Sequence, residues 1–274
     1  MRFKYLILLL CFVLSFSDLF SQKIISDSIP ENQISLNAFK NGEWFEFRVY
    51  YGVFNTSYIS LKIDADTINS RPVFHAQGYG KTVGLARLFF KVEDYYESFF
   101  DQKNGLPYRF IRNINEGGYT KNNEIFFNHE KSIARVHDKK NNTKNDYPIK
   151  KNVQDLISAY YYLRSFYDTS KIKINQTIGL NMFFDNENYL FKLKFLGKEI
   201  LETKFGDVEC LKFRPYVQSG RVFKEQESVN LWISNDKNKL PVRLQADLAV
   251  GSIKCDLENF KNLNNPFNIQ LRDE

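Results

Sequence analysis

Apolar and polar residues alternate with a period of two along most of this chain. Residues 59–63 place Ile59, Leu61 and Ile63 on one side of an extended backbone, with polar residues between them. Such alternation indicates β-strands, because successive side chains of a strand point to opposite faces. The pattern predicts strands at residues 44–51, 59–63, 73–79, 91–100, 108–114, 124–128, 133–137, 177–184, 189–196, 198–204, 208–216, 228–233, 242–248 and 251–260.

One segment has a different period. Between residues 153 and 167 the apolar positions recur every three or four residues, at Val153, Leu156, Ile157, Tyr160, Leu163 and Tyr167. That spacing predicts an amphipathic helix. Asn152 is placed to cap its N-terminus, and Asp155 lies in the first turn, where the helix dipole favours a negative charge. In a chain otherwise made of strands, the apolar face of this helix is expected to pack on a sheet.

Many short strands with turn residues between them predict a mainly β fold. We expect a strongly curved antiparallel sheet or a partly open β-barrel with one principal α-helix packed on it. Residues 41–261 fit a single β-rich domain. The mixed residues 22–40 form a lead-in segment, and the polar residues 262–274 are expected to be a loose tail. The Asn- and Lys-rich stretch 138–146 is predicted to be an exposed loop.

Two segments of the chain resemble each other. Residues 101–110 and residues 235–244 share the pattern Lys-Asn-x-Leu-Pro-x-Arg followed by an apolar residue, and the two prolines are 134 positions apart. In each, a polar turn is followed by a proline at the start of a strand, where its missing N–H does least harm. The repeat indicates either an internal duplication or two hairpins that use the same turn residues.

The N-terminus has the layout of a secretory signal peptide over residues 1–21. Arg2 and Lys4 precede an apolar run, and Ser17 and Asp18 interrupt that run well before the length of about 20 residues that a membrane span needs. A retained anchor helix is the disfavoured alternative. We therefore expect a periplasmic or secreted protein with no transmembrane span once the signal is removed.

Composition and charge reduce the classes of function that the chain could have. Aromatic residues make up 16% of the chain, which suits cross-strand packing and also the lining of apolar pockets. The formal charge of +6 is modest. The one basic cluster, residues 139–144, is diluted by asparagine, so a solvated loop explains it better than a nucleic-acid site. No nucleic-acid partner is expected.

Cysteine is scarce for an exported protein. Of three cysteines, Cys11 lies in the predicted signal peptide, which leaves Cys210 and Cys255. They could form one disulfide, or remain two buried thiols that act as small apolar side chains, which is the favoured reading. Either way, a scaffold held together by several disulfides is excluded.

No catalytic or metal signature stands out. The three histidines, His75, His129 and His137, lack the cysteines or carboxylates that would complete a zinc site, so no metal or cofactor is expected. The stretch 91–100 offers Glu93, Asp94 and Glu97, together with aromatic residues, as an acidic and aromatic groove of the type that handles sugars, with two of the carboxylates in catalytic roles. Acidic residues are common on the wet face of any strand, and this structural interpretation is favoured.

Several motifs together carry a resemblance to a known family. They are GEWFEF at residues 42–47, EGGY at 116–119, DLISAYYYLR at 155–164, LPVRL at 240–244 and VGS at 250–252. Over residues 40–260 the chain resembles the exported bacterial family numbered 3108 among domains of unknown function, in a Bacteroidetes-type member. The resemblance implies an exported β-rich domain with no established activity. In outline it is similar to curved-sheet periplasmic carriers that shield lipoprotein acyl chains.

These patterns favour a non-enzymatic binding or carrier protein of the cell envelope, with an acyl chain or another lipophilic molecule as ligand. The helix would supply the ligand-binding residues Tyr160, Tyr161, Leu163 and Arg164. Arg164 would lie at the mouth of the pocket or, alternatively, form a structural ion pair. Two other hypotheses remain: a glycan-binding or glycan-processing protein that uses residues 91–100, and a structural adaptor that docks partners on unpaired strand edges.

Overall fold

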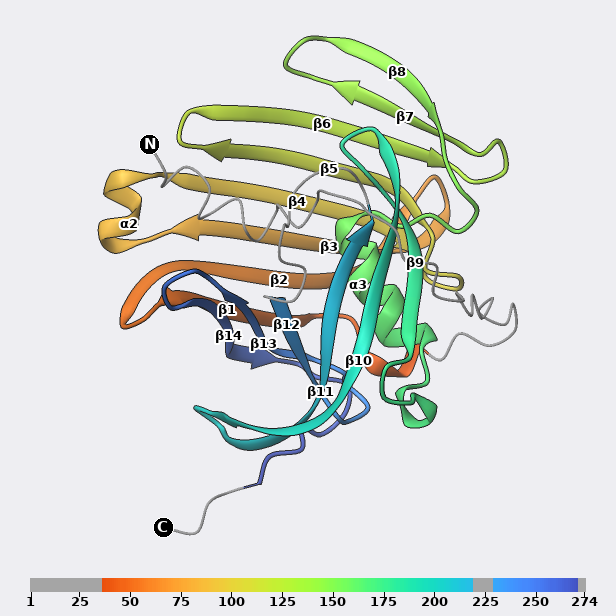
Figure 1. Cartoon of the computed structure of the whole chain (residues 1–274). Coiled ribbons are helices and arrows are strands. Elements are labelled where there is room, and N and C mark those ends of the chain that lie inside the picture. The colour runs from red at the N-terminus through yellow and green to blue at the C-terminus, as the bar shows by residue number, and fades with distance from the viewer. Residues whose placement is uncertain (1–35, 219–228, 271–274) are drawn as a thin grey trace.

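A computed structural model describes residues 36–218 and 229–270, so the predicted signal peptide and most of the lead-in segment lie outside the described residues. The described strands form one antiparallel sheet of 14 strands in the order β8-β7-β6-β5-β4-β3-β2-β1-β14-β13-β12-β11-β10-β9. The sheet curves around helix α3, as Figure 1 shows. It is an open sheet, because its two edge strands, β8 and β9, are not paired with each other. The predicted fold class is confirmed.

The first part of the described chain forms a short 3-10 helix, eight strands and the short helix α2. These elements are η2 (Leu36–Ala38), β1 (Glu43–Tyr51), β2 (Phe54–Ile68), β3 (Arg71–Thr82), α2 (Gly84–Phe89), β4 (Val92–Asp101), β5 (Pro107–Glu116), β6 (Tyr119–Asn128), β7 (Ile133–Asp138) and β8 (Thr143–Pro148). The second part comprises α3 (Leu156–Phe166), η3 (Thr169–Lys171), β9 (Thr177–Phe184), β10 (Glu187–Thr203), β11 (Gly206–Gln218), β12 (Val229–Ser234), β13 (Pro241–Asp247) and β14 (Ser252–Lys261).

Nearly every pair of neighbouring strands is a hairpin of consecutive segments. The exception is the seam between β1 and β14, where Val49 lies opposite Cys255 and Trp44 lies opposite Lys261. In β1 the alternate residues Phe45, Phe47 and Val49 are buried, as the period-two pattern predicts. This seam joins the N-terminal strands and the C-terminal strands into a single sheet.

Helix α3 lies inside the curve of the sheet, between β3 and β4 on one side and β9 on the other. It begins at Leu156, and its cap is Asp155, whose carboxylate accepts hydrogen bonds from the backbone N–H groups of Ile157 and Ser158. The predicted cap at Asn152 is therefore wrong. The residues between them are extended because Gln154 pairs with Met182 of β9 as an isolated bridge.

The sheet repeats a block of six strands. Strands β1 to β6 begin at residues 43, 54, 71, 92, 107 and 119, and β9 to β14 begin at 177, 187, 206, 229, 241 and 252. Corresponding strands therefore start 133–137 residues apart, close to the separation of the two Leu-Pro motifs. Strands β7 and β8 and helix α3 lie between the two blocks in the sequence.

The structure differs from the predicted elements in three places. The predicted loop at 138–146 overlaps the start of β8, whose residues are almost all exposed because it is an edge strand. The two strands predicted at 189–196 and 198–204 are one strand, β10, with an irregularity between Phe195 and Gly197. The short helix α2 was not predicted.

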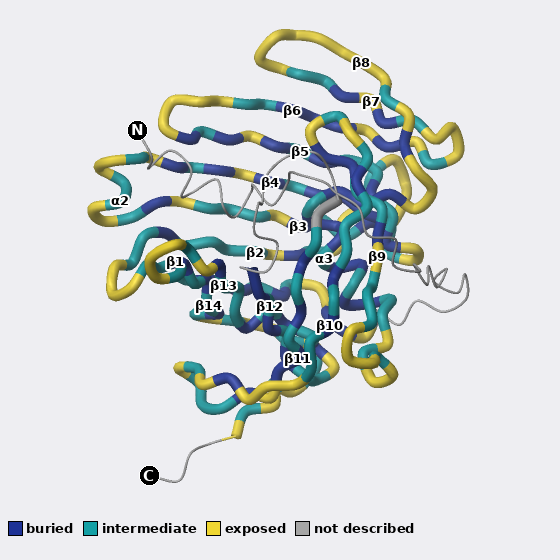
Figure 2. The backbone as a smooth tube through the Cα atoms, in the orientation of Figure 1, coloured by how far each residue is buried: buried dark blue, intermediate teal, exposed yellow. Residues whose placement is uncertain are grey.

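Burial is concentrated around α3, whereas the hairpin tips are exposed (Figure 2). The described part of the predicted tail contacts the sheet: Gln270 bridges to Asp207, and the side chain of Asn265 donates to the carbonyl of Asn37. Neither α2 nor α3 has the length and apolar character that a bilayer crossing requires, and no other described segment is a longer helix.

The cap of α3 provides a test of the fold. Asp155 is completely buried and also accepts a hydrogen bond of 2.6 Å from the hydroxyl of Ser98 in β4. We expect Asp155→Ala to lower the free energy of unfolding by about 2 kcal/mol, the upper end for an N-cap, because it also leaves Ser98 without its acceptor. Urea unfolding measures this loss, and Asp168→Ala, at an exposed 3-10 helix, is the control that should change little.

Candidate functional site

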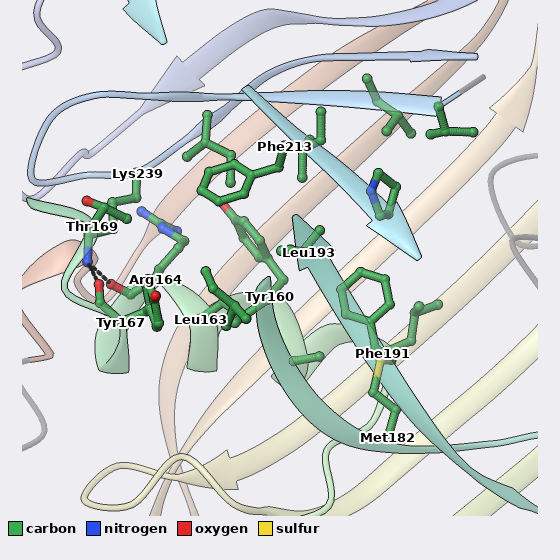
Figure 3. A pocket seen from close by; sticks show the side chains of 18 of the residues that line it. Tyr160, Leu163, Arg164, Tyr167, Thr169, Met182, Phe191, Leu193, Phe213 and Lys239 are labelled. Carbon is green, nitrogen blue, oxygen red and sulfur yellow. Dashed lines mark hydrogen bonds between the residues drawn. The ribbon is translucent and has the colours of Figure 1, made fainter. Parts of the chain in front are cut away.

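An apolar cavity of about 290 Å³ lies between α3 and the C-terminal strands (Figure 3). One wall is the face of α3 that carries Ala159, Tyr160 and Leu163. The other walls are alternate residues of the strands β9 to β13, which share the inner face of the curved sheet. Those strand residues are Ile178, Met182, Phe184, Tyr189, Phe191, Leu193, Phe213, Pro215, Val229, Leu231, Ile233 and Leu244.

The few polar groups of the cavity gather near the C-terminal end of α3. Lys239 donates from Nζ to the backbone carbonyls of Arg164 and Tyr167, which are orphan acceptors at the helix end. Thr169 also lines this end. The hydroxyl of Tyr160 is buried and has no hydrogen-bond partner among the described residues. Burial raises the pKa of this hydroxyl, so it stays a neutral donor.

The two six-strand blocks carry side chains of different size at corresponding positions beside α3. In the first block Ser98 lies opposite Phe110, and in the second Leu231 lies opposite Leu244. When the two blocks are aligned on these two pairs, each first-block residue has a counterpart in the second block. Tyr96 corresponds to Val229, Phe100 to Ile233 and Phe110 to Leu244.

Three aromatic rings therefore fill the space beside α3 in the first block. The Phe100 ring stacks on Tyr161 of α3 with centroids 5.5 Å apart. Three smaller aliphatic side chains stand in the second block, and all three line the cavity. Space that aromatic rings occupy on one side of the helix is left open on the other.

Arg164 forms a structural ion pair, which is one of the two roles that the sequence left open for it. Its guanidinium makes two hydrogen bonds with the carboxylate of Glu43, at 2.6 and 2.8 Å, and both side chains are almost fully buried. It also donates to the backbone carbonyls of Ala38 and Asn238. Four of the five N–H donors of the guanidinium bind these acceptors, so Arg164 is fixed by the protein at the border of the cavity.

The four residues predicted as ligand-binding thus separate into three groups. Tyr160 and Leu163 face the cavity, and Arg164 borders it while bound to Glu43. Tyr161 points to the opposite side, where it packs against Phe39 with ring centroids 4.8 Å apart. The strand residues of the cavity were not predicted, because alternation assigns residues to one face of a strand without showing which face is inside.

Cys210 and Cys255 are both free and buried. Cys210 lies in β11 and Cys255 in β14, and two strands separate them in the sheet. Three strand spacings amount to about 14 Å, well beyond the reach of a disulfide. The two thiols act as small core residues. The disulfide between Cys210 and Cys255, which the sequence left as an alternative, is not formed.

The acidic stretch 91–100 does not form the carboxylate pair considered for glycan chemistry. Glu93 and Asp94 are neighbours on strand β4 and point to opposite faces, Glu93 towards Arg87 and Tyr79. Asp94 is buried and lies beside Glu116 of β5 instead. Burial and the neighbouring Asp94 charge raise the pKa of Glu116 to about 7, and burial raises the pKa of Asp94.

Two of the three histidines, His75 and His129, hold structural positions. The ring of His75 contacts Glu97 at 2.7 Å, and that of His129 contacts the carbonyl of Pro107 at 2.8 Å. Burial lowers the pKa of His129, so its ring is neutral at pH 7. The described residues contain no group of three or more metal-ligating side chains of the His, Cys, Asp and Glu types.

Fold and cavity define a class of protein in which a curved antiparallel sheet clasps one helix around an apolar space. The sequence model of the family described as protein of unknown function (DUF3108) matches residues 46–258, and the chain belongs to this family. No curated protein matches the chain.

Two solved structures are similar in outline. One is a β-barrel-like protein of domain of unknown function DUF1849 from Brucella abortus, with 9% identity and a TM-score of 0.48 over 80% of this chain and 97% of that one. The other is a provisionally assigned lipoprotein from Parabacteroides distasonis, with 11% identity and a TM-score of 0.31 over 84% of this chain and 100% of that one.

The buried ion pair gives a stability prediction. Glu43→Leu leaves the Arg164 charge buried without its partner, and we expect a loss of about 3–5 kcal/mol in the free energy of unfolding. The double variant Glu43→Leu with Arg164→Met removes both charges and should regain part of that loss. The recovery stays incomplete because the carbonyls of Ala38 and Asn238 lose their donor. Denaturant unfolding of both variants checks this, and a double variant no more stable than Glu43→Leu alone would contradict it.

The Asp94–Glu116 pair predicts how stability depends on pH. The pKa of Glu116 is raised to about 7 in the fold, so between about pH 4.5 and 7 the folded chain keeps a proton that the unfolded chain releases. The contribution of this group to stability is therefore complete below pH 4.5 and is lost as pH rises through 7.

We expect the Tm advantage of the unsubstituted chain over Glu116→Gln to shrink between pH 5 and pH 8. Thermal unfolding of both chains at several pH values measures it, and Glu258→Gln, at a surface ion pair, is the control. A difference that stays constant across this range would show that Glu116 does not carry the dependence.

Proposed function

We propose that this protein is a non-enzymatic carrier of the bacterial cell envelope that binds a lipophilic ligand in the cavity between α3 and strands β9 to β13. The observation that carries the proposal is the cavity itself: it is lined by aliphatic and aromatic side chains and holds one buried hydroxyl without a partner, that of Tyr160. Ligand sites are concave and apolar, with a few polar groups that orient the ligand.

The size and lining of the cavity favour an acyl chain. Its volume of about 290 Å³ stands at the lower end of the usual range for small-molecule sites. Burial of six methylenes would contribute about 5 kcal/mol before the cost of association. The Tyr160 hydroxyl would donate to an ester or carboxyl oxygen of the ligand. The location outside the cytoplasm is supported by the predicted signal peptide at residues 1–21.

Nothing in the geometry favours glycan chemistry on β4. Glu93 and Asp94 point to opposite faces of the sheet, and the buried Asp94–Glu116 pair lies among strand side chains and the ion pair of Arg112 with Asp185. The carrier is therefore the one function that we put forward.

The aromatic residues of the first block suggest a variant that tests whether the cavity binds the ligand. Ile233→Phe places a ring where the first block has Phe100, and should close part of the cavity. Displacing about two methylenes of ligand costs about 1.6 kcal/mol, or about tenfold in affinity. Binding of a dansyl-labelled undecanoic acid, followed by its fluorescence, measures this loss. Native mass spectrometry and an organic extract of the purified protein show whether a lipid co-purifies.

The control is Ile200→Phe, the same exchange on the exposed part of β10. It should leave probe binding unchanged. Equal binding by the unsubstituted chain and the Ile233→Phe variant, or no probe binding and no co-purified lipid, would overturn the proposal.

A further inference from the structure

A row of exposed apolar side chains lies at one end of the sheet. Eleven large apolar or aromatic residues are exposed in the described part of the chain, and seven of them lie in four connections between strands or next to them. In Figure 2 the connections at β1, α2 and β6 are exposed tips. The seven residues are Val53, Phe54, Leu85, Leu88, Phe89, Tyr119 and Val250. We call them the apolar rim.

The α2 connection is the clearest part of the apolar rim. Helix α2 presents Leu85, Leu88 and Phe89 at positions i, i+3 and i+4, which lie on one face of a helix. These side chains are 65%, 80% and 85% exposed, and the helix has no buried residue at all. A face of this kind adds nothing to the folded core, and exposed apolar patches mark interaction sites.

The four connections are joined to one another by hydrogen bonds. The hydroxyl of Tyr51 donates to the carbonyl of Val250, which holds the β13–β14 turn beside the β1–β2 turn. The N–H of Val83, before α2, donates to the carbonyl of Thr56 near the start of β2. After α2, the carbonyl of Lys91 accepts from Gly117 of the β5–β6 turn. The four connections that carry the apolar rim therefore lie side by side at this end of the sheet.

Positive charge accompanies the apolar rim. The segment 80–93 carries Lys81, Arg87 and Lys91 and one acid, Glu93, which lies 3.4 Å from Arg87 and 3.6 Å from Lys91. Three positive charges and one negative charge leave this segment with a formal net charge of +2. The β7–β8 turn adds further lysines, and Lys140 reaches the neighbouring Thr120. Apolar side chains surrounded by lysine and arginine suit the interface of an anionic membrane, where the chains enter the acyl boundary and the cations meet phosphates.

We propose that the apolar rim docks the protein on an anionic phospholipid surface. The occupant is a bilayer rather than a bound peptide because the apolar side chains are exposed at hairpin tips, whereas a peptide needs a groove or a free strand edge. This surface is separate from the residues that line the cavity. The docking proposal and the carrier proposal can therefore fail independently.

A site-specific fluorescence experiment tests the docking. In the full chain, Leu88→Trp places an indole at the apolar rim, and Ile200→Trp places one at an exposed site on β10. With phosphatidylglycerol vesicles that contain brominated lipid, we expect quenching in the Leu88→Trp variant and none in the Ile200→Trp variant, after subtraction of the unsubstituted chain. With phosphatidylcholine vesicles the quenching should be much weaker. Because the readout is local, attachment through the N-terminal segment does not mimic it.

A second variant measures the strength of docking. Leu88→Ser with Phe89→Ser should weaken sedimentation with phosphatidylglycerol vesicles by about tenfold or more, because two apolar side chains leave the interface. Ile174→Ser with Ile200→Ser is the matched control and should bind as the unsubstituted chain does. Equal quenching at both tryptophan sites, equal binding to neutral vesicles, or a dimer that forms through the apolar rim without vesicle binding would overturn the proposal.

Discussion

The buried pair of Arg164 and Glu43 holds the two parts of this fold in place. Arg164 belongs to α3, Glu43 begins β1, and the guanidinium also binds carbonyls of η2 and of the β12–β13 turn. One side chain thus connects the helix to both blocks of strands. A buried charge of this kind is tolerated only when its hydrogen-bonding groups are satisfied, and here four acceptor atoms surround it. The position of the helix, and with it the shape of the cavity, follows from this contact.

The repeated block of strands explains why the cavity is one-sided. Both blocks present equivalent positions to α3, and the same curvature would leave similar space on each side. Aromatic side chains fill the first block, and Val229, Ile233 and Leu244 leave the second one open. The two blocks share a similar arrangement of strands. Smaller side chains at a few positions of the second block leave a cavity beside α3, where the first block has a packed core.

The sequence predicted the class of the fold and part of the site, and the misses have physical causes. The helical stripe identified Tyr160 and Leu163, because spacing along a helix selects the face that is buried. The ligand-binding set also included Tyr161, which is not part of that stripe, because consecutive helical residues point about 100° apart. Asn152 lost its predicted role as cap because pairing of Gln154 with β9 keeps the preceding residues extended. The edge strand β8 is polar on both faces and so resembles a loop.

The seam between β1 and β14 has a consequence for how the chain reaches its fold. It is the one ladder of the described sheet that joins segments about 200 residues apart, and every other ladder is a local hairpin. Local hairpins form early, whereas a distant pairing waits until the intervening chain has been brought together. One edge of the aromatic strand β1 therefore stays unpaired, and prone to pair with other chains, until β14 is available. The sheet is complete only when β14 has joined β1.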